Sequence, residues 1–181
     1  GTLDPLATGL LIICTGKETK NIEKYQGLEK RYDGHFTLGA TTPSFDLETP
    51  IDKTFDVSHV TLPKIIEVAK AMLGSQEQTP PAYSAVKVKG VRAYDHARRG
   101  EEVVLKKRKI RLSRFDVEVK ELPTVHFDIT CSKGTYIRSI ANDFGEKLKS
   151  GAHLSKLCRT QIGPYLLQET ITLAVLSLIH I

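Results

Sequence analysis

The chain has 181 residues, of which 40% are hydrophobic and 26% are charged, a balance typical of a soluble globular protein. No apolar run approaches the roughly 18 residues of a membrane span, and no secretory signal precedes the first motif. Its three cysteines are far apart, and neither they nor the six histidines show metal-ligand spacing. We therefore expect a reduced, cytoplasmic protein without a bound metal.

The net charge of +5 is unevenly distributed along the chain. Residues 84–114 contain eleven Lys or Arg against three acids, a local net charge of +8, which leaves the rest of the chain at −3. A basic face on a slightly acidic body favours a polyanionic partner such as nucleic acid. On charge alone, a solvated Lys/Arg surface is an equally good interpretation.

The first predicted elements are a buried strand, a short helix, a second strand and a loop. The apolar run at residues 10–14 predicts the buried strand, and the short helix follows at residues 20–25. Strict alternation over residues 31–38 predicts a half-exposed strand. Residues 40–56 are rich in Thr, Pro, Ser and Asp, which is typical of a loop.

A helix with clear end signals comes next. Thr61 is a suitable N-cap, and Gly74 stands in the usual position after a helix end. The expected apolar stripe consists of Ile65, Ile66, Ala69, Met72 and Leu73. The stretch at 76–90, which contains two adjacent prolines, predicts extended or irregular chain, and residues 91–99 predict a short helix ended by Gly100.

The last predicted elements are a hairpin and a helix. Two alternating runs, at residues 110–119 and 125–131, face each other across a turn at 120–123. Their parity changes between Leu112 and Phe115, which indicates a bulge. Residues 139–148 return to helical periodicity. Because helices and antiparallel strands are mixed, the expected class is α+β.

Asp4 lies in the opening motif GTLDPLATG, between a leucine and a proline. Pro5 pushes the residue before it toward extended geometry, and glycines at both ends of the motif allow close backbone approach. We expect the Asp4 carboxylate to be held by a rigid turn at the edge of a strand. From these residues alone, an ordinary Asx-type turn is the better interpretation.

Family resemblance gives this motif a meaning. Residues 1–11 resemble the catalytic motif of the TruB family, the tRNA pseudouridine synthases that act on the T-loop uridine. Four further blocks resemble the family in the same order: residues 30–32 with 38–46, residues 78–87 with 90–94, residues 131–139, and residues 151–154 with 157–160.

The resemblance implies a pseudouridine synthase fold, with a mixed, mainly antiparallel sheet flanked by helices. It implies conversion of the uridine at position 55 of tRNA, with Asp4 as a nucleophile that attacks either the ribose or the base. Arg138 is then the residue that keeps Asp4 ionised, because a nearby cation favours the carboxylate. Tyr32 matches the tyrosine that stacks on the flipped uracil and relays the proton lost from C5; a core aromatic is the alternative.

The same resemblance assigns the substrate-binding residues. Tyr136 and Leu157 correspond to positions that line the uracil pocket, and Lys20 to a basic position near the site; Leu157 also fits a plain core role. We expect RNA phosphates to be contacted by five cations of the basic stretch, namely Lys87, Lys89, Arg92, Arg98 and Arg99. The expected partner is the T-arm of tRNA, bound by a monomer without metal or organic cofactor.

The domain prediction follows from the five blocks. Residues 1–175 are expected to form the catalytic domain without its N-terminal part, residues 176–181 fit a non-native tail, and no C-terminal RNA-binding domain is expected in this chain. Two other functions remain open at this point. One is a non-catalytic RNA-binding or tRNA-folding module of the same fold, and the other is a synthase acting on another RNA.

Overall fold

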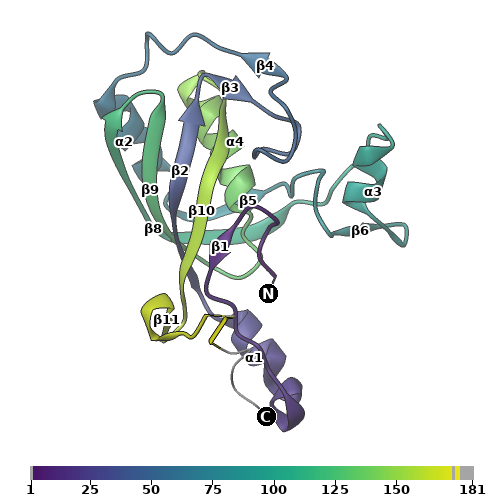
Figure 1. Ribbon diagram of the computed structural model, residues 1–181. Helices are drawn as coiled ribbons and strands as arrows, with labels where there is room; N and C mark the ends of the chain where they lie inside the picture. Colours follow the sequence, from purple (N-terminus) through teal and green to yellow (C-terminus); the bar gives the residue numbers. More distant parts are fainter. Residues whose placement is uncertain (1, 173, 176–181) are drawn as a thin grey trace.

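The computed structural model describes residues 2–172, 174 and 175, and its centre is a seven-stranded mixed sheet (Figure 1). The strand order is β1-β10-β2-β9-β8-β5, and β11 pairs with β10. The strands are β1 (Thr8–Gly9), β2 (Lys30–Leu38), β5 (Gly74–Gln78), β8 (Arg108–Glu121), β9 (Thr124–Cys131), β10 (Ala152–Ile162) and β11 (Tyr165–Leu166). Only the β1–β10 pair is parallel, so the sheet is mainly antiparallel as predicted.

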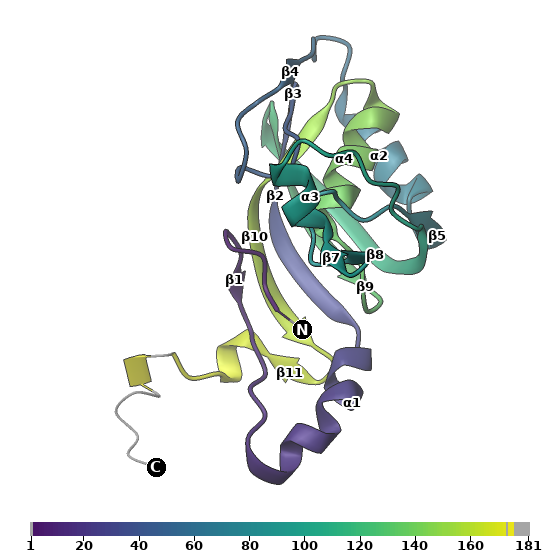
Figure 2. The same cartoon turned by 90° about the vertical axis from the view of Figure 1, so that its right-hand side faces the viewer.

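Helices and small ribbons surround this sheet. The helices are α1 (Ile22–Gly27), α2 (Leu62–Ala71), α3 (Ala93–Arg98), α4 (Ile137–Leu148) and the 3₁₀ helices η1 (Gly16–Asn21) and η2 (Leu167–Glu169). The ribbons are β3 (Ala40–Thr41) with β4 (Lys53–Thr54), and β6 (Lys87–Val88) with β7 (Val91–Arg92). In Figures 1 and 2, α2 and α4 cover one face of the sheet, whereas α3 and the β6–β7 ribbon project away from it. This arrangement confirms the α+β class.

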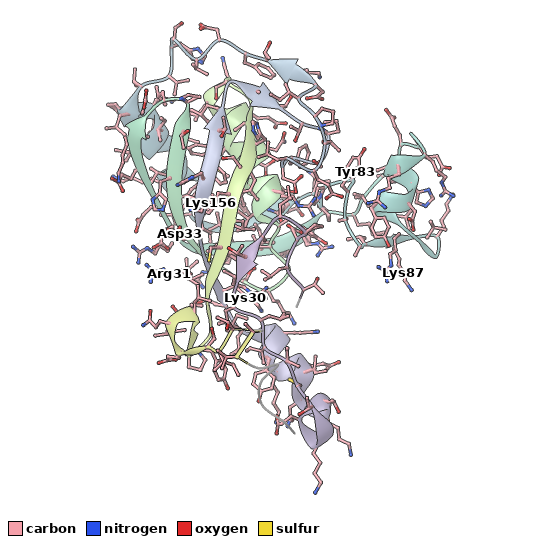
Figure 3. The ribbon with its side chains drawn as sticks, viewed as in Figure 1. Lys30, Arg31, Asp33, Tyr83, Lys87 and Lys156 are labelled. Carbon is pink, nitrogen blue, oxygen red and sulfur yellow. The ribbon has the colours of Figure 1, made fainter. Side chains whose placement is uncertain are left out.

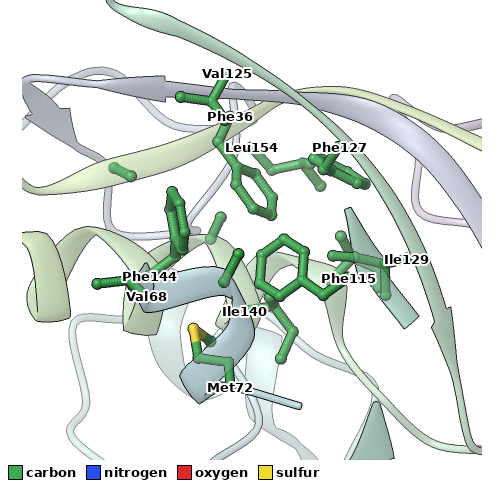
Figure 4. Packing of buried hydrophobic residues seen from close by; sticks show 14 of the residues in the cluster. Phe36, Val68, Met72, Phe115, Val125, Phe127, Ile129, Ile140, Phe144 and Leu154 are labelled. Atoms are coloured by element: carbon green, nitrogen blue, oxygen red, sulfur yellow. The ribbon is translucent and has the colours of Figure 1, made fainter. Parts of the chain in front are cut away.

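The hydrophobic core lies between the sheet and helices α2 and α4 (Figure 4). Phe36 of β2 packs against Phe127 of β9, with ring centroids 4.2 Å apart, and against Phe144 of α4 at 5.6 Å. Burial of each such side chain stabilises the fold by about 1.5–3 kcal/mol. The strict alternation of β2 places Phe36 and Leu38 in this core, as its pattern predicted.

The opposite face of the sheet carries charged side chains, because residues that alternate with the core positions point outward. Figure 3 labels Arg31, Asp33 and Lys156 on this face. Arg31 binds Asp128 of the neighbouring strand through two guanidinium nitrogens, and Asp33 accepts a hydrogen bond from His126 at 2.6 Å. Both contacts therefore link β2 to the neighbouring strand β9.

The hairpin and the helices confirm most of the local predictions. Strands β8 and β9 pair with a register shift between Leu112 and Arg114, which is the predicted bulge. Thr61 is the N-cap of α2, although its side chain makes no capping hydrogen bond, whereas the helix ends at Ala71, so Gly74, with a φ of +93°, begins β5 rather than following the helix end directly. The short helices at 20–25 and 91–99 are present as α1 and α3, each beginning two residues later than predicted.

Part of the predicted stripe on α2 is wrong. Ile66 and Leu73 were expected to be buried but are 36% and 44% exposed, whereas Val68 is buried with Ile65 and Met72. The buried positions follow a spacing of three and four residues, so they form one face of the helix, and Ile66 lies on another.

The expected strand at residues 10–14 is also wrong. Only Thr8 and Gly9 pair with β10, and the Leu10 N–H then donates to the Arg159 carbonyl, after which the chain leaves the sheet. Leu11 and Ile13 are 49% and 60% exposed. Apolar composition alone does not place a strand, because a strand also needs a neighbour to pair with.

Besides the two-residue strands, two longer strands of the sheet were not predicted. Residues 74–78 form β5 at the edge of the sheet, where their polar sequence GSQEQ gives no alternating pattern. Residues 152–162 form β10, which lies between β1 and β2 and carries two register shifts against β2. Such irregularities shift the side-chain alternation, so the two-residue period is lost from the sequence.

The expected non-native tail, residues 176–181, lies outside the described residues. Within residues 2–172, 174 and 175, no helix is both long and apolar enough to cross a membrane.

We predict that Gly34→Ala destabilises the fold. A Cβ at Gly34 would lie 2.2 Å from the Lys156 carbonyl oxygen and 2.7 Å from a ring carbon of Phe127, so β2 and β10 could not keep their spacing. Overpacking of this kind costs about 1–3 kcal/mol in the free energy of unfolding, measurable by urea denaturation. Gly27→Ala is the control, because no atom lies within 4 Å of its Cβ. Equal stability of the two variants would contradict this account.

Candidate active site

Asp4 lies in a tight turn that is fixed to the sheet. The Ala7 N–H donates to the Asp4 carbonyl at 3.0 Å, and Pro5 follows Asp4 in the turn. Gly9 ends the turn with a φ of +110°, and a Cβ there would lie 2.3 Å from the Arg159 carbonyl oxygen of β10. The motif therefore needs glycine at position 9, both for its backbone angle and for the close approach to β10.

Arg138 holds the Asp4 carboxylate from the first turn of α4. Its Nε donates to Asp4 Oδ2 and its Nη2 to Asp4 Oδ1, both at 3.0 Å. The Arg138 side chain is 4% exposed, whereas that of Asp4 is 32% exposed. Such a two-point contact fixes the plane of a carboxylate as well as its charge. The structure thus brings together the two residues that the sequence suggested as partners.

A second carboxylate, Asp46, also lies close to the Arg138 guanidinium. Its Oδ2 is 3.6 Å from Arg138 Nε, and its side chain is 5% exposed. Asp46 also accepts hydrogen bonds from the Ser44 hydroxyl at 2.6 Å and from the Glu48 N–H at 2.9 Å. Asp46 is a residue of the site that the sequence did not predict. The only available signal was its place in the second family block, because a contact between residues 46 and 138 leaves no local pattern.

The third nitrogen of the Arg138 guanidinium, Nη1, donates to main-chain carbonyl oxygens. Arg138 Nη1 donates to the Tyr83 carbonyl at 3.0 Å and to the Ser44 carbonyl at 3.4 Å. Four chain segments that are distant in sequence therefore meet at one guanidinium. A buried arginine is stable only when its charge is paired and its donors are satisfied.

A cavity of about 1110 Å³ opens beside Asp4. Asp4, Tyr32, Tyr136 and Leu157 all line it, so four of the predicted site residues share one space. Burial is the main cause that raises the pKa of the Tyr32 hydroxyl, which keeps this hydroxyl protonated at neutral pH. Leu157 is only 7% exposed and also belongs to the core, which confirms its core role, whereas its role in a uracil pocket stays a prediction.

Comparison with known proteins identifies the family. Residues 1–137 match the family described as TruB family pseudouridylate synthase, N terminal domain. The chain belongs to this family. The resemblance seen in the sequence is thus confirmed, and with it the class of activity, that of a pseudouridine synthase.

Two curated relatives show how far the similarity extends. A tRNA pseudouridine synthase B of Flavobacterium johnsoniae is 51% identical over 175 residues, which cover 97% of this chain and 76% of the relative. A protein of the same name from Phocaeicola vulgatus is 49% identical over 172 residues, covering 95% of this chain and 73% of the relative.

Solved structures of similar fold confirm the pseudouridine synthase architecture. The chain aligns with a crystal structure of a Cbf5-Nop10-Gar1 complex at a TM-score of 0.70 and 29% identity, covering 96% of this chain and 43% of that one. It also aligns with an H/ACA RNP bound to a substrate RNA containing 2′-deoxyuridine, at a TM-score of 0.66 and 26% identity, covering 95% of this chain and 40% of that one. The chain therefore spans less than half of either aligned structure.

Positive charge dominates the cavity of this TruB family member. Asp4 is the only acid among the described residues that line it. The cations are Lys30, Lys87, Lys89, Lys106, Lys107, Arg108, Lys109, Lys133 and Arg159. Figure 3 shows Lys30 at the lower end of the sheet and Lys87 on the projecting ribbon, so the charges come from both sides of the cavity. A cleft of one sign concentrates ligands of the opposite sign.

Not all predicted residues lie at this cavity. The guanidinium carbons of Arg92 and Arg98 lie over the Tyr94 ring, 5.7 and 5.3 Å from its centroid, and Arg99 pairs with Glu101 at 3.0 Å. Lys20 lies exposed on η1, and neither it nor these three arginines belongs to the cavity lining. Their roles in RNA binding remain predictions. Among the described residues, no group of three His, Cys, Asp or Glu side chains is arranged to hold a metal ion.

We predict that Asp46→Asn destabilises the fold by about 2–4 kcal/mol, because it removes one of the two carboxylates that compensate the buried Arg138 charge. Urea denaturation at pH 7 measures the change. Asp52→Asn is the matched control, since Asp52 is exposed and accepts one hydrogen bond from Thr41, so its loss should cost less than about 1 kcal/mol. Equal effects of both substitutions would show that Asp46 does not compensate Arg138.

Proposed function

We propose that this chain carries the catalytic site of a tRNA pseudouridine synthase that converts the T-loop uridine at position 55, with Asp4 as the nucleophile. The observation that carries the proposal is the two-point contact between Asp4 and Arg138 at the wall of a cation-lined cavity. The curated relatives that bear the name tRNA pseudouridine synthase B support tRNA as the substrate.

The reaction is an isomerisation in which atoms are conserved. The bond between uracil N1 and ribose C1′ breaks, the base turns, and a bond forms between C5 and C1′. The C5 proton leaves and N1 ends with a proton, so no cofactor is consumed. Asp4 forms a transient bond either to the ribose or to the base, and that bond breaks when the product is complete. A carboxylate held in one orientation by Arg138 is suited to both routes.

The uracil has to leave the RNA stack and be retained while it turns. Unstacking costs a few kcal/mol, and stacking on an aromatic ring returns about 1–3 kcal/mol per base. Tyr32 supplies such a ring at the cavity, and its protonated hydroxyl is suited to relay the C5 proton. Tyr136 and Leu157 form further walls of the proposed uracil pocket.

The rest of the binding energy comes from phosphates of the T-arm in this proposal. Lys87 and Lys89 line the cavity. Arg92, Arg98 and Arg99 extend the positive surface along residues 87–99, the projecting segment formed by the β6–β7 ribbon and α3. Contacts of this type position RNA without reading its sequence. We further propose that the enzyme acts as a monomer in the cytoplasm, where its tRNA substrate is found.

Two alternative functions are outcomes of the same tests. A non-catalytic RNA-binding module would bind tRNA without converting it, and the joint presence of Asp4 and Tyr32 at one cavity, with Arg138 bonded to Asp4, favours catalysis instead. A synthase for another RNA would convert that RNA and leave tRNA unchanged. The aligned H/ACA RNP structure contains a substrate RNA, so a substrate RNA other than tRNA is a specific alternative to test.

We predict that Asp4→Asn abolishes conversion and leaves tRNA binding within about threefold of wild type, because the amide keeps the shape of the side chain but is not a nucleophile. Tritium release from tRNA labelled at uridine C5 measures conversion by the full-length protein, and filter binding measures the Kd. Asp52→Asn serves as the control. Equal tritium release by wild type and Asp4→Asn would overturn the nucleophile assignment.

We also predict that the double substitution Arg98→Glu and Arg99→Glu weakens tRNA binding and lowers the slope of log K against log salt by about two, one per lost phosphate contact. Lys70→Glu with Lys147→Glu reverses two exposed charges on α2 and α4, away from the cavity, as a charge-matched control. The RNA-binding role of the projecting segment is wrong if both double variants give the wild-type Kd and slope.

A further inference from the structure

We infer that Gln78 and Arg108 are positioning residues for the reaction: together they hold Tyr136 in place and, through it, Arg138. The two residues are cross-strand neighbours, since Gln78 of β5 pairs with Arg108 of β8. Neither has a place in the chemistry proposed above. The inference rests on the proposed function, because it concerns the geometry of the same site.

The Gln78 amide binds the main chain of Tyr136 at two points. Its Nε2 donates to the Tyr136 carbonyl at 3.0 Å, and its Oε1 accepts from the Tyr136 N–H at 2.8 Å. Gln78 is only 1% exposed. Burial of an amide destabilises the fold unless its N–H and C=O groups form hydrogen bonds. Both of these hydrogen bonds of Gln78 go to Tyr136. The Gln78 side chain therefore bonds the main-chain N–H and C=O of Tyr136 as a neighbouring strand would.

Tyr136 is the residue that precedes α4, so its main chain sets where the helix begins. Arg138 follows two residues later. Ser139 makes a parallel attachment, because its hydroxyl donates to the Thr79 carbonyl at 2.8 Å. The first turn of α4 is thus fastened to residues 78 and 79. Because Arg138 orients Asp4, a shift of this turn would move the carboxylate relative to the cavity.

Arg108 holds the other part of Tyr136, its ring. The guanidinium carbon lies 5.1 Å from the ring centroid, and Nη1 donates to the Gly134 carbonyl at 3.4 Å. A planar guanidinium over an aromatic face is favoured by electrostatics and by stacking. Both Arg108 and Tyr136 line the cavity. The orientation of this cavity wall is therefore set before any substrate arrives, which is what preorganisation requires.

The test separates the chemical step from binding. Single-turnover conversion of tRNA by excess full-length enzyme gives the rate constant, and filter binding gives the Kd. We expect Gln78→Ala to lower the rate constant about 10- to 100-fold with the Kd changed less than about threefold, since small displacements at a site cost this much. Arg108→Lys keeps the charge but loses the planar stack, and we expect about a tenfold loss in rate constant.

A neighbouring glutamine provides the matched control. Gln76 lies on the same strand and uses its amide to donate to the Met72 carbonyl at 2.7 Å, but it makes no contact with Tyr136. Gln76→Ala should lower the melting temperature and leave the rate constant unchanged below the melting transition. Arg108→Lys, at a partly exposed position, keeps the test decisive if Gln78→Ala fails to fold.

A readout independent of catalysis keeps this inference separate from the proposed function. Hydrogen exchange of the Tyr136 amide should accelerate at least tenfold in Gln78→Ala but not in Gln76→Ala, because only Gln78 accepts that hydrogen. If wild type fails to convert tRNA, the proposed function is wrong whatever the exchange result. If wild type converts tRNA and Gln78→Ala and Arg108→Lys do so at the same rate, or lose only Kd, the positioning role is overturned.

Discussion

The burial of one guanidinium beside two carboxylates is the constraint on which the site depends. Arg138 is almost fully inaccessible, and its charge is balanced by Asp4 and Asp46, whose carboxylates both lie near its Nε. Each partner comes from a loop that would otherwise have few reasons to stay in place. The same ion therefore organises the fold locally and leaves one carboxylate oriented toward the cavity, with about a third of its surface open.

The sheet makes this meeting possible by bringing distant segments to one end of α4. Strand β10 lies between β1 and β2 and so connects the Asp4 turn to the strand that carries Tyr32. The core phenylalanines hold α4 against the sheet from behind, so the first turn of α4 has a fixed distance to the Asp4 turn. Packing in the core thus determines geometry at the site, which it meets at Leu157.

The sequence predicts those parts of the fold whose burial repeats with a simple period. Strands β2 and β9 alternate, β8 alternates on either side of its bulge, and the core residues of α4 recur at helical spacing, so all of them were predictable. Strand β5 was not, because its residues are polar and only its pairing with β8 makes it a strand. The apolar run at residues 10–14 shows the converse, since it lacks a partner strand beyond Gly9.

The residues of the site divide in a similar way, into those that a local motif indicates and those that only distant contacts reveal. Asp4, Tyr32 and Arg138 were found because each stands in a short motif of the TruB family. Asp46 and Gln78 act through contacts to residues some 60 to 90 positions away along the chain, and no local pattern encodes such contacts. Only the folded arrangement shows that the guanidinium needs a second acid, or that an amide in an edge strand holds the start of a helix.

The distribution of charge over the molecule affects how RNA approaches it. On the open face of the sheet, Arg31 and Asp128 form a close ion pair, so their fields largely cancel within a few ångströms. Among the described residues that line the cavity, nine are cations and one is an acid, so this lining is strongly net positive. A polyanion that comes within the Debye length of about 8 Å is therefore drawn toward the cavity. This attraction orients the encounter before contact, so that fewer collisions begin with the RNA on the wrong side of the sheet.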